Sequence, residues 1–160
     1  MADIDDIMKD VDSDDVYYEE AVDEGQIKPG TYEASVVALR RKLNTKTKKG
    51  YHCDIYWVRY KIANDSPNFS NRLVRDAGQW RYRSPNMKKA NLYYKKFLDK
   101  LGIGLTKSES DGKIKYSLPS ISEEMILGKK VLINVYKEEW SDSRGYHNEP
   151  VANLVKLIDD

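Results

Sequence analysis

The chain has 160 residues, of which 40% are hydrophobic and 33% charged, and this predicts one domain with a modest core. No stretch approaches the roughly 20 apolar residues of a membrane helix, and the acidic N-terminus lacks the basic and apolar regions of a secretory signal. The single cysteine, Cys53, excludes a disulfide within the chain and is typical of a reducing compartment. We therefore expect a soluble, cytoplasmic protein.

The net charge of +1 conceals an unequal distribution of charge along the chain. Residues 1–24 contain 11 acidic residues and one base, whereas residues 25–160 contain 15 acidic residues and 26 bases. A basic body with an acidic appendage indicates a protein that binds a polyanion. The alternative is a lysine-rich surface that serves only solubility, although the bases here are interleaved with aromatic residues.

Residues 1–28 are expected to form an acidic, largely disordered tail, and residues 29–160 the ordered domain. Two interpretations of the tail are open. In the first, the tail is disordered with a frayed helical turn. In the second, it carries a short motif, which either folds on a replication or recombination protein or covers the basic surface when DNA is absent. The residues that would contact a partner recur at helical spacing and are Ile4, Ile7, Met8 and Val11.

Three strands are predicted in the first half of the domain, because β-branched and aromatic residues are concentrated there. The first covers residues 31–43 and the second residues 51–62, with a polar turn at residues 44–50 between them. The third covers residues 72–82, and Gly78 is expected to mark a bulge or a bend within it.

A helix is predicted next, with Ser84 as its N-cap, Pro85 in its first turn and Gly102 just beyond its end. Five lysines occupy one side of it. The apolar residues of the opposite side recur every 3.6 positions and are expected to pack on the domain: Met87, Ala90, Tyr94, Phe97, Leu98 and Leu101.

The rest of the chain predicts two further strands. Residues 104–122 read as a weakly structured connection with a small hairpin around Asp111-Gly112. A strand over residues 129–140, a loop over residues 141–150 and a strand over residues 151–158 follow. The expected fold is therefore mainly β: a five-stranded barrel of the oligonucleotide-binding (OB) type, with one helix between strands 3 and 4.

In such a barrel the ligand lies on strands 2 and 3, between the loops that join strands 1–2 and 4–5. Strand 2 alternates, so Trp57 shares a face with Arg59 and Lys61. Two bases on one face are difficult to bury, and this favours an outward Trp57 beside its cations. The alternative places Trp57 in the core, with the two basic side chains reaching out to solvent.

The third strand leaves its orientation open, because alternation separates Trp80 and Tyr82 from Arg81 and Arg83, and either set can face outward. Aromatic side chains on which bases stack, and cations that contact phosphates, are what a single-strand binder requires. The candidate nucleic-acid-binding residues are Arg40, Lys42, Lys46, Lys48, Lys49, Tyr51, Trp57, Arg59, Lys61, Arg72, Trp80, Arg81, Tyr82, Arg144 and Tyr146.

The sequence carries no phosphate loop, no zinc-binding spacing and no nucleophile elbow, and we expect neither a metal nor a cofactor. Asp54, Asp76 and Glu138 are the acids from which a nuclease metal cluster could be built. Acids scattered through strands are usually solvated or ion-paired, so the chain is not expected to be an enzyme.

Residues 29–158 resemble the phage-encoded single-stranded-DNA-binding proteins of OB-fold type. The resemblance rests on the opening PGTYEASVVA, the segment YHCDIYWVRYKI, the helix end FLDKLGI, and the late segments GKKVLINVYKEE and NLVKLI. It implies protection of single strands during phage DNA replication, recombination or repair in the cytoplasm of the bacterial host. The chain departs from the family pattern because its acidic run lies at the N-terminus and not at the C-terminus.

The expected function is therefore sequence-non-specific binding of single-stranded DNA. Two rivals are an adaptor of the same fold that binds another protein, such as a virion or host-takeover factor, and, less favoured, a structure-specific nuclease. Membrane partners are not expected, and formation of a homo-oligomer is left open.

Overall fold

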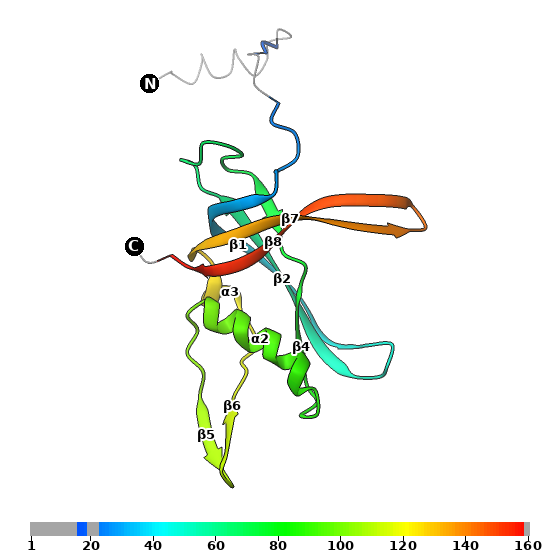
Figure 1. Cartoon of the computed structure of the whole chain (residues 1–160), viewed down its shortest axis with the longest axis vertical. Coiled ribbons are helices and arrows are strands. Elements are labelled where there is room, and N and C mark those ends of the chain that lie inside the picture. The colour runs from blue at the N-terminus through cyan, green and yellow to red at the C-terminus, as the bar shows by residue number, and fades with distance from the viewer. Residues whose placement is uncertain (1–15, 19–22, 159–160) are drawn as a thin grey trace, which may run out of the picture.

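The computed structural model describes residues 16–18 and 23–158, which form a mainly β structure (Figure 1). Its strands are β1 (Gly30–Lys46), β2 (His52–Ile62), β3 (Leu73–Arg75), β4 (Gln79–Tyr82), β5 (Lys107–Ser110), β6 (Lys113–Tyr116), β7 (Lys130–Asp142) and β8 (Gly145–Leu157). Its helices are α2 (Lys88–Lys100) and α3 (Glu123–Ile126). None of the helices in the described part of the chain has the length and apolar character needed to cross a membrane.

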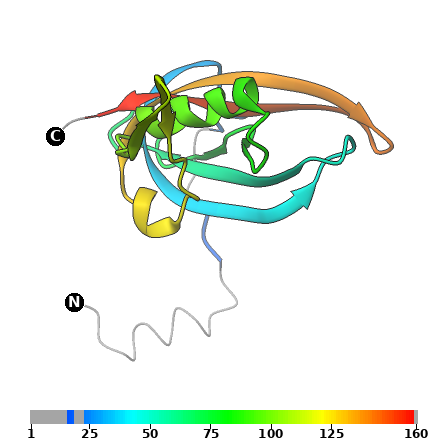
Figure 2. The ribbon, with the colours of Figure 1, turned by 90° about the horizontal axis from the view of Figure 1, so that it is seen from below.

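The main sheet is antiparallel, with the strand order β3-β2-β1-β7-β8 and with β4 also paired to β2. The two ends of this order approach each other, because Asp76 and Ala152 form an isolated parallel bridge. Figure 2 shows the resulting strong curvature, with α2 lying against the curved sheet. Hydrogen bonding does not continue from β3 to β8 as a ladder within the described residues, so the sheet is not a closed barrel.

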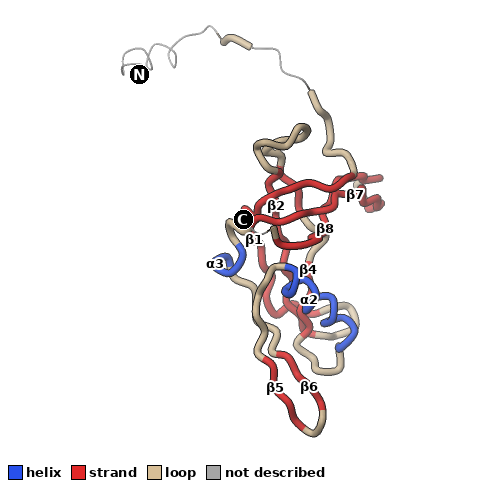
Figure 3. Tube along the Cα trace, turned by 60° about the vertical axis from the view of Figure 1, so that its left-hand side comes forward, coloured by secondary structure: helices blue, strands red, loops and turns tan. Residues whose placement is uncertain are grey.

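The mainly β class is confirmed, and a helix separates the first group of strands from the last. The predicted number of five strands is wrong, because the described residues form eight. The expected third strand is divided into β3 and β4 on either side of Gly78, and β5 and β6 form a two-stranded hairpin of their own. This hairpin turns at Asp111-Gly112, as predicted, and extends away from the main sheet (Figure 3).

The predicted loop over residues 141–150 is wrong, because β7 and β8 continue through it and pair as far as Asp142 and Gly145. The pairing leaves only Ser143 and Arg144 in the turn. Polar residues in both strands made this segment resemble a loop, although a solvated hairpin has the same composition. The long β7–β8 and β1–β2 hairpins extend to the same side in Figures 1 and 2.

Helix α2 begins later than predicted and ends as predicted. Ser84 lies in a turn before the helix, where its backbone carbonyl accepts a hydrogen bond from the Met87 N–H, and the helix starts at Lys88 without a side-chain cap. At the other end, Gly102 adopts φ +72°, and the N–H groups of Gly102 and Ile103 bond to the carbonyls of Asp99 and Leu98. This pair of hydrogen bonds is a Schellman motif, which satisfies carbonyls that the helix end would otherwise leave unpaired.

The core lies between the concave side of the sheet and α2. Every second side chain of β2 is fully buried, namely Tyr56, Val58, Tyr60 and Ile62. These side chains share one core cluster with the buried residues of α2, which are Tyr94, Phe97 and Leu98. Burial of each such side chain contributes roughly 1.5–3 kcal/mol. The Tyr56 hydroxyl contacts Ser120 Oγ at 2.6 Å and the Tyr94 hydroxyl donates to the Pro119 carbonyl, so residues 118–121 are tied across the core.

The packed part of the chain begins before Pro29, within residues expected to belong to the tail. Ile27 is buried in the core, and the Glu24 carboxylate accepts a hydrogen bond of 2.7 Å from the Phe69 N–H. The Gln26 side chain contacts Asn148 of β8 and Lys137 of β7. Residues 23–28 are therefore held against the sheet.

Asp76 replaces the ladder hydrogen bonds where the third strand is interrupted. Its carboxylate accepts hydrogen bonds from the N–H groups of Val58 (3.0 Å) and Gly78 (3.1 Å) and from the Gln79 amide (3.2 Å), while its own N–H donates to the Val58 carbonyl. Burial raises the pKa of this carboxyl to about 6, although the hydrogen bonds and nearby Arg75 oppose the rise.

The raised pKa of Asp76 predicts a loss of stability as the pH rises from about 4 to about 6. In this window the folded carboxyl keeps its proton while the unfolded one, with a pKa near 3.8, releases it, so the folded state binds more protons. The difference between 3.8 and about 6 corresponds to about 3 kcal/mol of unfolding free energy, lost across the window. Asp76→Asn keeps the acceptor oxygen and cannot ionise.

Thermal unfolding of both proteins between pH 4 and pH 7 checks this expectation. The midpoint of the parent should fall by several degrees relative to that of Asp76→Asn. The lowered pKa of Asp54 changes the stability only at pH values below the ordinary pKa range of an aspartate. It therefore does not mask the effect of Asp76. Parallel curves for the two proteins would contradict the prediction.

Candidate nucleic-acid interface

The outward face of β2 carries the residues expected to contact nucleic acid. Trp57 is half-buried, and Arg59 and Lys61 are exposed, opposite the fully buried Tyr56, Val58 and Tyr60. The alternative of a core Trp57 is therefore wrong. Residues directly opposite one another in an antiparallel sheet share a face, so the partners of these residues in β1, β3 and β4 belong to the same surface.

Beside Trp57 and Arg59, the strand β1 supplies cations to this face. Arg40 lies directly opposite Trp57, and its guanidinium carbon is 5.5 Å from the centre of the indole ring. This is within the range of a cation–π interaction. Lys42 lies opposite Ile55, two pairs further along and therefore on the same face. β1 thus contributes two cations to this face, of which Arg40 borders the indole.

The strands β3 and β4 complete the face from the other side. Arg75 lies opposite Arg59, and Trp80 lies opposite Ile55. Trp80 is 39% exposed. The open question of the third strand is thereby answered: Trp80 and Tyr82 face outward with Trp57, and Arg81 and Arg83 turn to the other side.

A one-residue bulge decides this orientation. Between the pairs Arg59–Arg75 and Tyr56–Gln79, the interrupted strand has three residues where β2 has two. An extra residue moves every later side chain to the opposite face of a strand. Without the bulge, Gln79 and Arg81 would share the face of Arg75, and Trp80 would point inward.

The two indole rings meet at Gly78, within the bulge. A Cβ atom built on Gly78 would lie 3.1 Å from Nε1 of Trp57 and 3.1 Å from Cη2 of Trp80, so both rings border the same space. Gly78 has φ +103°, a conformation that side chains disfavour. A hollow of about 590 Å³ adjoins Trp57 and is lined by Arg40, Arg59 and Arg75 together with Ala38, Leu39 and Val58.

Arg81, a candidate contact, is instead held by the buried Asp54. Arg81 and Arg83 lie 2.7 and 2.9 Å from the Asp54 carboxylate, and Arg81 also donates to the Leu118 carbonyl. Burial raises the pKa of Asp54, but hydrogen bonds from Arg83, the Asn44 N–H and Arg81 outweigh it, and the pKa lies below its ordinary value. Removal of Asp54 would leave Arg81 half-buried without this partner.

The remaining candidates lie around this face in different places. Lys46 ends β1, Lys48 and Lys49 are exposed in the turn that follows it, and exposed Tyr51 precedes β2. Arg72 is half-buried, with its guanidinium carbon 5.9 Å from the centre of the Phe69 ring. The tail candidates Ile4, Ile7, Met8 and Val11 lie outside the described residues.

The candidates Arg144 and Tyr146 lie in the β7–β8 hairpin, where a loop beside the ligand was expected. Arg144 is in its two-residue turn, beside an exposed Tyr146, while Trp140 stacks on His147 with the ring centres 5.0 Å apart. Acidic residues outnumber bases between Lys137 and Glu149, the acids being Glu138, Glu139, Asp142 and Glu149. The charge of this hairpin is thus unfavourable for phosphates.

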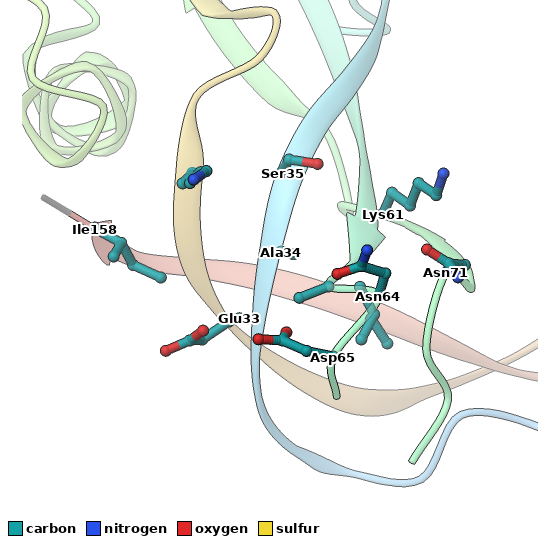
Figure 4. Close-up of a pocket in the computed structure, with 11 residues that line it drawn as sticks. Glu33, Ala34, Ser35, Lys61, Asn64, Asp65, Asn71 and Ile158 are labelled. Atoms are coloured by element: carbon teal, nitrogen blue, oxygen red, sulfur yellow. The ribbon is translucent and has the colours of Figure 1, made fainter. Parts of the chain in front are cut away.

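A second hollow, of about 460 Å³, has a mixed charge. Glu33 and Asp65 line it together with Lys61, Asn64 and Asn71 (Figure 4). The carboxylates make it less suited to a polyanion than the hollow beside Trp57. Asp54, Asp76 and Glu138 belong to no cluster, since no group of three or more His, Cys, Asp or Glu suited to a metal occurs among residues 16–18 and 23–158.

Sequence reasoning missed two members of this face, Arg75 and Gly78. Arg75 was not among the candidates, and Gly78 was expected to mark a bulge or a bend but not to lie between the two indoles. No family model matches the chain, and a search of curated proteins gives no match either. The case for a function therefore rests on the residues and their geometry.

Gly78→Ala is expected to destabilise the fold and to disturb both indoles. The added methyl group meets ring atoms at 3.1 Å and the backbone has φ +103°, so a loss of about 1–3 kcal/mol in unfolding free energy is expected. A changed tryptophan emission spectrum should accompany it. Gly104→Ala is the matched control, because no atom lies within 4 Å of its added methyl group. Equal stabilities of the two variants would contradict the proposed geometry.

Proposed function

We propose that this chain binds single-stranded DNA without sequence preference, through the outward face of β2, β3 and β4, and that it acts in phage DNA replication, recombination or repair. One observation carries the proposal: two tryptophan rings border the same space over Gly78, and arginines from β1, β2 and β3 surround them. Stacking on aromatic rings tolerates any base, while cations contact the backbone, and neither reads sequence.

The proposed fold is a partly open OB barrel. It is supported by the pairing of β1 with both β2 and β7, by the helix between the first and last strands, and by the parallel bridge Asp76–Ala152 between the sheet ends. In OB folds, nucleic acid lies across strands 2 and 3. In the proposed barrel, the equivalent surface is the outward face of β2, β3 and β4 that carries Trp57 and Trp80, called the tryptophan face below.

Replacement of the indoles is the first test. A stacked base contributes roughly 1–3 kcal/mol, so Trp80→Ala, alone and together with Trp57→Ala, should lower the affinity for labelled oligothymidylate, the double variant by more than about tenfold. Trp140→Ala is the matched control, since Trp140 stacks on His147 in the β7–β8 hairpin. Affinity is measured by fluorescence anisotropy, and thermal unfolding establishes that each variant is folded.

The parent protein should also show quenched tryptophan emission on addition of oligothymidylate. If folded Trp57 and Trp80 variants bind as tightly as Trp140→Ala, or if the parent binds no single strand, the proposal fails. An adaptor of the same fold, which binds an acidic protein, would give the second result.

Salt dependence tests the cations separately. Each phosphate contact contributes about −0.7 to the slope of log affinity against log salt concentration for a single strand. Arg59→Gln with Lys61→Gln should therefore make the slope shallower by about 1.4. The matched control is Lys28→Gln with Lys156→Gln, which removes two exposed charges that lie outside β2, β3 and β4 and outside α2 and the β5–β6 hairpin. An equal change of slope in both double variants would place the phosphates elsewhere.

A further inference from the structure

The tryptophan face continues beyond Trp80 into another hollow. Tyr82 lies two residues further along β4 and therefore on the same side as Trp80. Next to it a hollow of about 540 Å³ opens between the end of β4, the beginning of α2 and the β5–β6 hairpin. Tyr82, Arg83, Asn91 and Tyr116 are among the residues that line it.

Specific contacts hold the walls of this hollow in place. The Asn91 side chain bonds to both backbone groups of Tyr82, accepting from its N–H at 2.8 Å and donating to its carbonyl at 3.0 Å. From the same helix, the Lys95 ammonium lies 4.5 Å from the centre of the Tyr116 ring, a cation–π distance. The hollow thus joins two aromatic residues that face the solvent, one on each wall.

The charges on α2 and the β5–β6 hairpin favour a polyanion that continues from the tryptophan face toward this hollow. The helix α2 and the hairpin together contain eight lysines and three acids. One of these acids, Asp99, already pairs with Lys95 at 2.9 Å. The β7–β8 hairpin has the opposite balance, with Glu138, Glu139, Asp142 and Glu149 against Lys137 and Arg144. A strand is attracted toward the first of these surfaces and repelled by the second.

We infer that bound single-stranded DNA continues from Trp80 past Tyr82 into this hollow, where a further base stacks on Tyr116. The half-exposed Arg83, which also pairs with Asp54, and the Lys95 ammonium, which also pairs with Asp99, contact its phosphates. The β5–β6 hairpin is then one wall of the DNA path and lengthens the footprint beyond the tryptophan face. This extension rests on the proposed function, because the strand enters the hollow from Trp80.

Tyr116→Ala tests the extension with two lengths of oligothymidylate, about 6 and about 16 nucleotides, which lie within the range of footprints of single OB folds. It should weaken binding of the long oligonucleotide by about tenfold and leave that of the short one within about twofold. Tyr93→Ala is the matched control, because Tyr93 is a 71% exposed tyrosine on the outer side of α2. Tyr116→Phe keeps the ring and should bind both lengths like the parent.

The two proposals fail in different ways. If the parent binds the short oligonucleotide and Trp80→Ala weakens it, but Tyr116→Ala and Tyr93→Ala bind the long one equally, the extension is overturned and the proposed function stands. If Tyr116→Phe loses as much affinity as Tyr116→Ala, stacking on the ring is overturned. If the parent binds neither oligonucleotide, the proposed function and the extension both fall.

Discussion

The surface of this protein depends on bulges on both sides of β2. On one side, an extra residue between the pairs Val36–Tyr60 and Ala38–Arg59 brings Arg40 to the outward face. On the other, the extra residue between Arg75 and Gln79 brings Trp80 there. Because side chains alternate with a period of two, removal of either insertion would turn the later side chains of that strand inward. Trp57 acquires its neighbours only because both strands are shifted.

The bulge beside Gly78 needs compensation inside the fold, and Asp76 supplies it. An interruption of this kind leaves the Val58 N–H without a strand partner, and the Asp76 carboxylate accepts its hydrogen bond while also accepting one from Gly78. The backbone of the same residue forms the bridge to Ala152, so the bulge and the approach of the sheet ends share one residue. The buried Asp76 carboxyl, with its raised pKa, and the outward position of Trp80 therefore both follow from one inserted residue.

Sequence patterns predicted which side chains are buried where the pattern of a single strand or helix decides it. They missed the orientation of side chains that depends on how two strands pair. The alternation of β2 alone indicated which of its residues are buried, and the apolar period of α2 indicated its packed side. Gly78 indicated a bulge or a bend, but whether Trp80 or Arg81 faces outward depends on how many residues are inserted opposite β2, and no period within the strand gives that number. Ser84 and Pro85 gave a helix-start signal that a preceding turn also satisfies, and Asp76 resembled a solvated acid because its partners are backbone groups.

The charge of the surface differs between the two ends of the tryptophan face. The β1–β2 hairpin and the region of α2 and the β5–β6 hairpin are basic, whereas the β7–β8 hairpin is acidic near its tip. Glu149 of that acidic hairpin lies 3.4 Å from Arg75, so it already neutralises part of the cationic face at one end. A bound polyanion would compete with Glu149 for Arg75 there, and beside Tyr82 it would compete with Asp54 for Arg83 and with Asp99 for Lys95. The tryptophan face is thus asymmetric in charge: its surroundings are basic toward the β1–β2 hairpin and toward α2 and the β5–β6 hairpin, and acidic toward the β7–β8 hairpin.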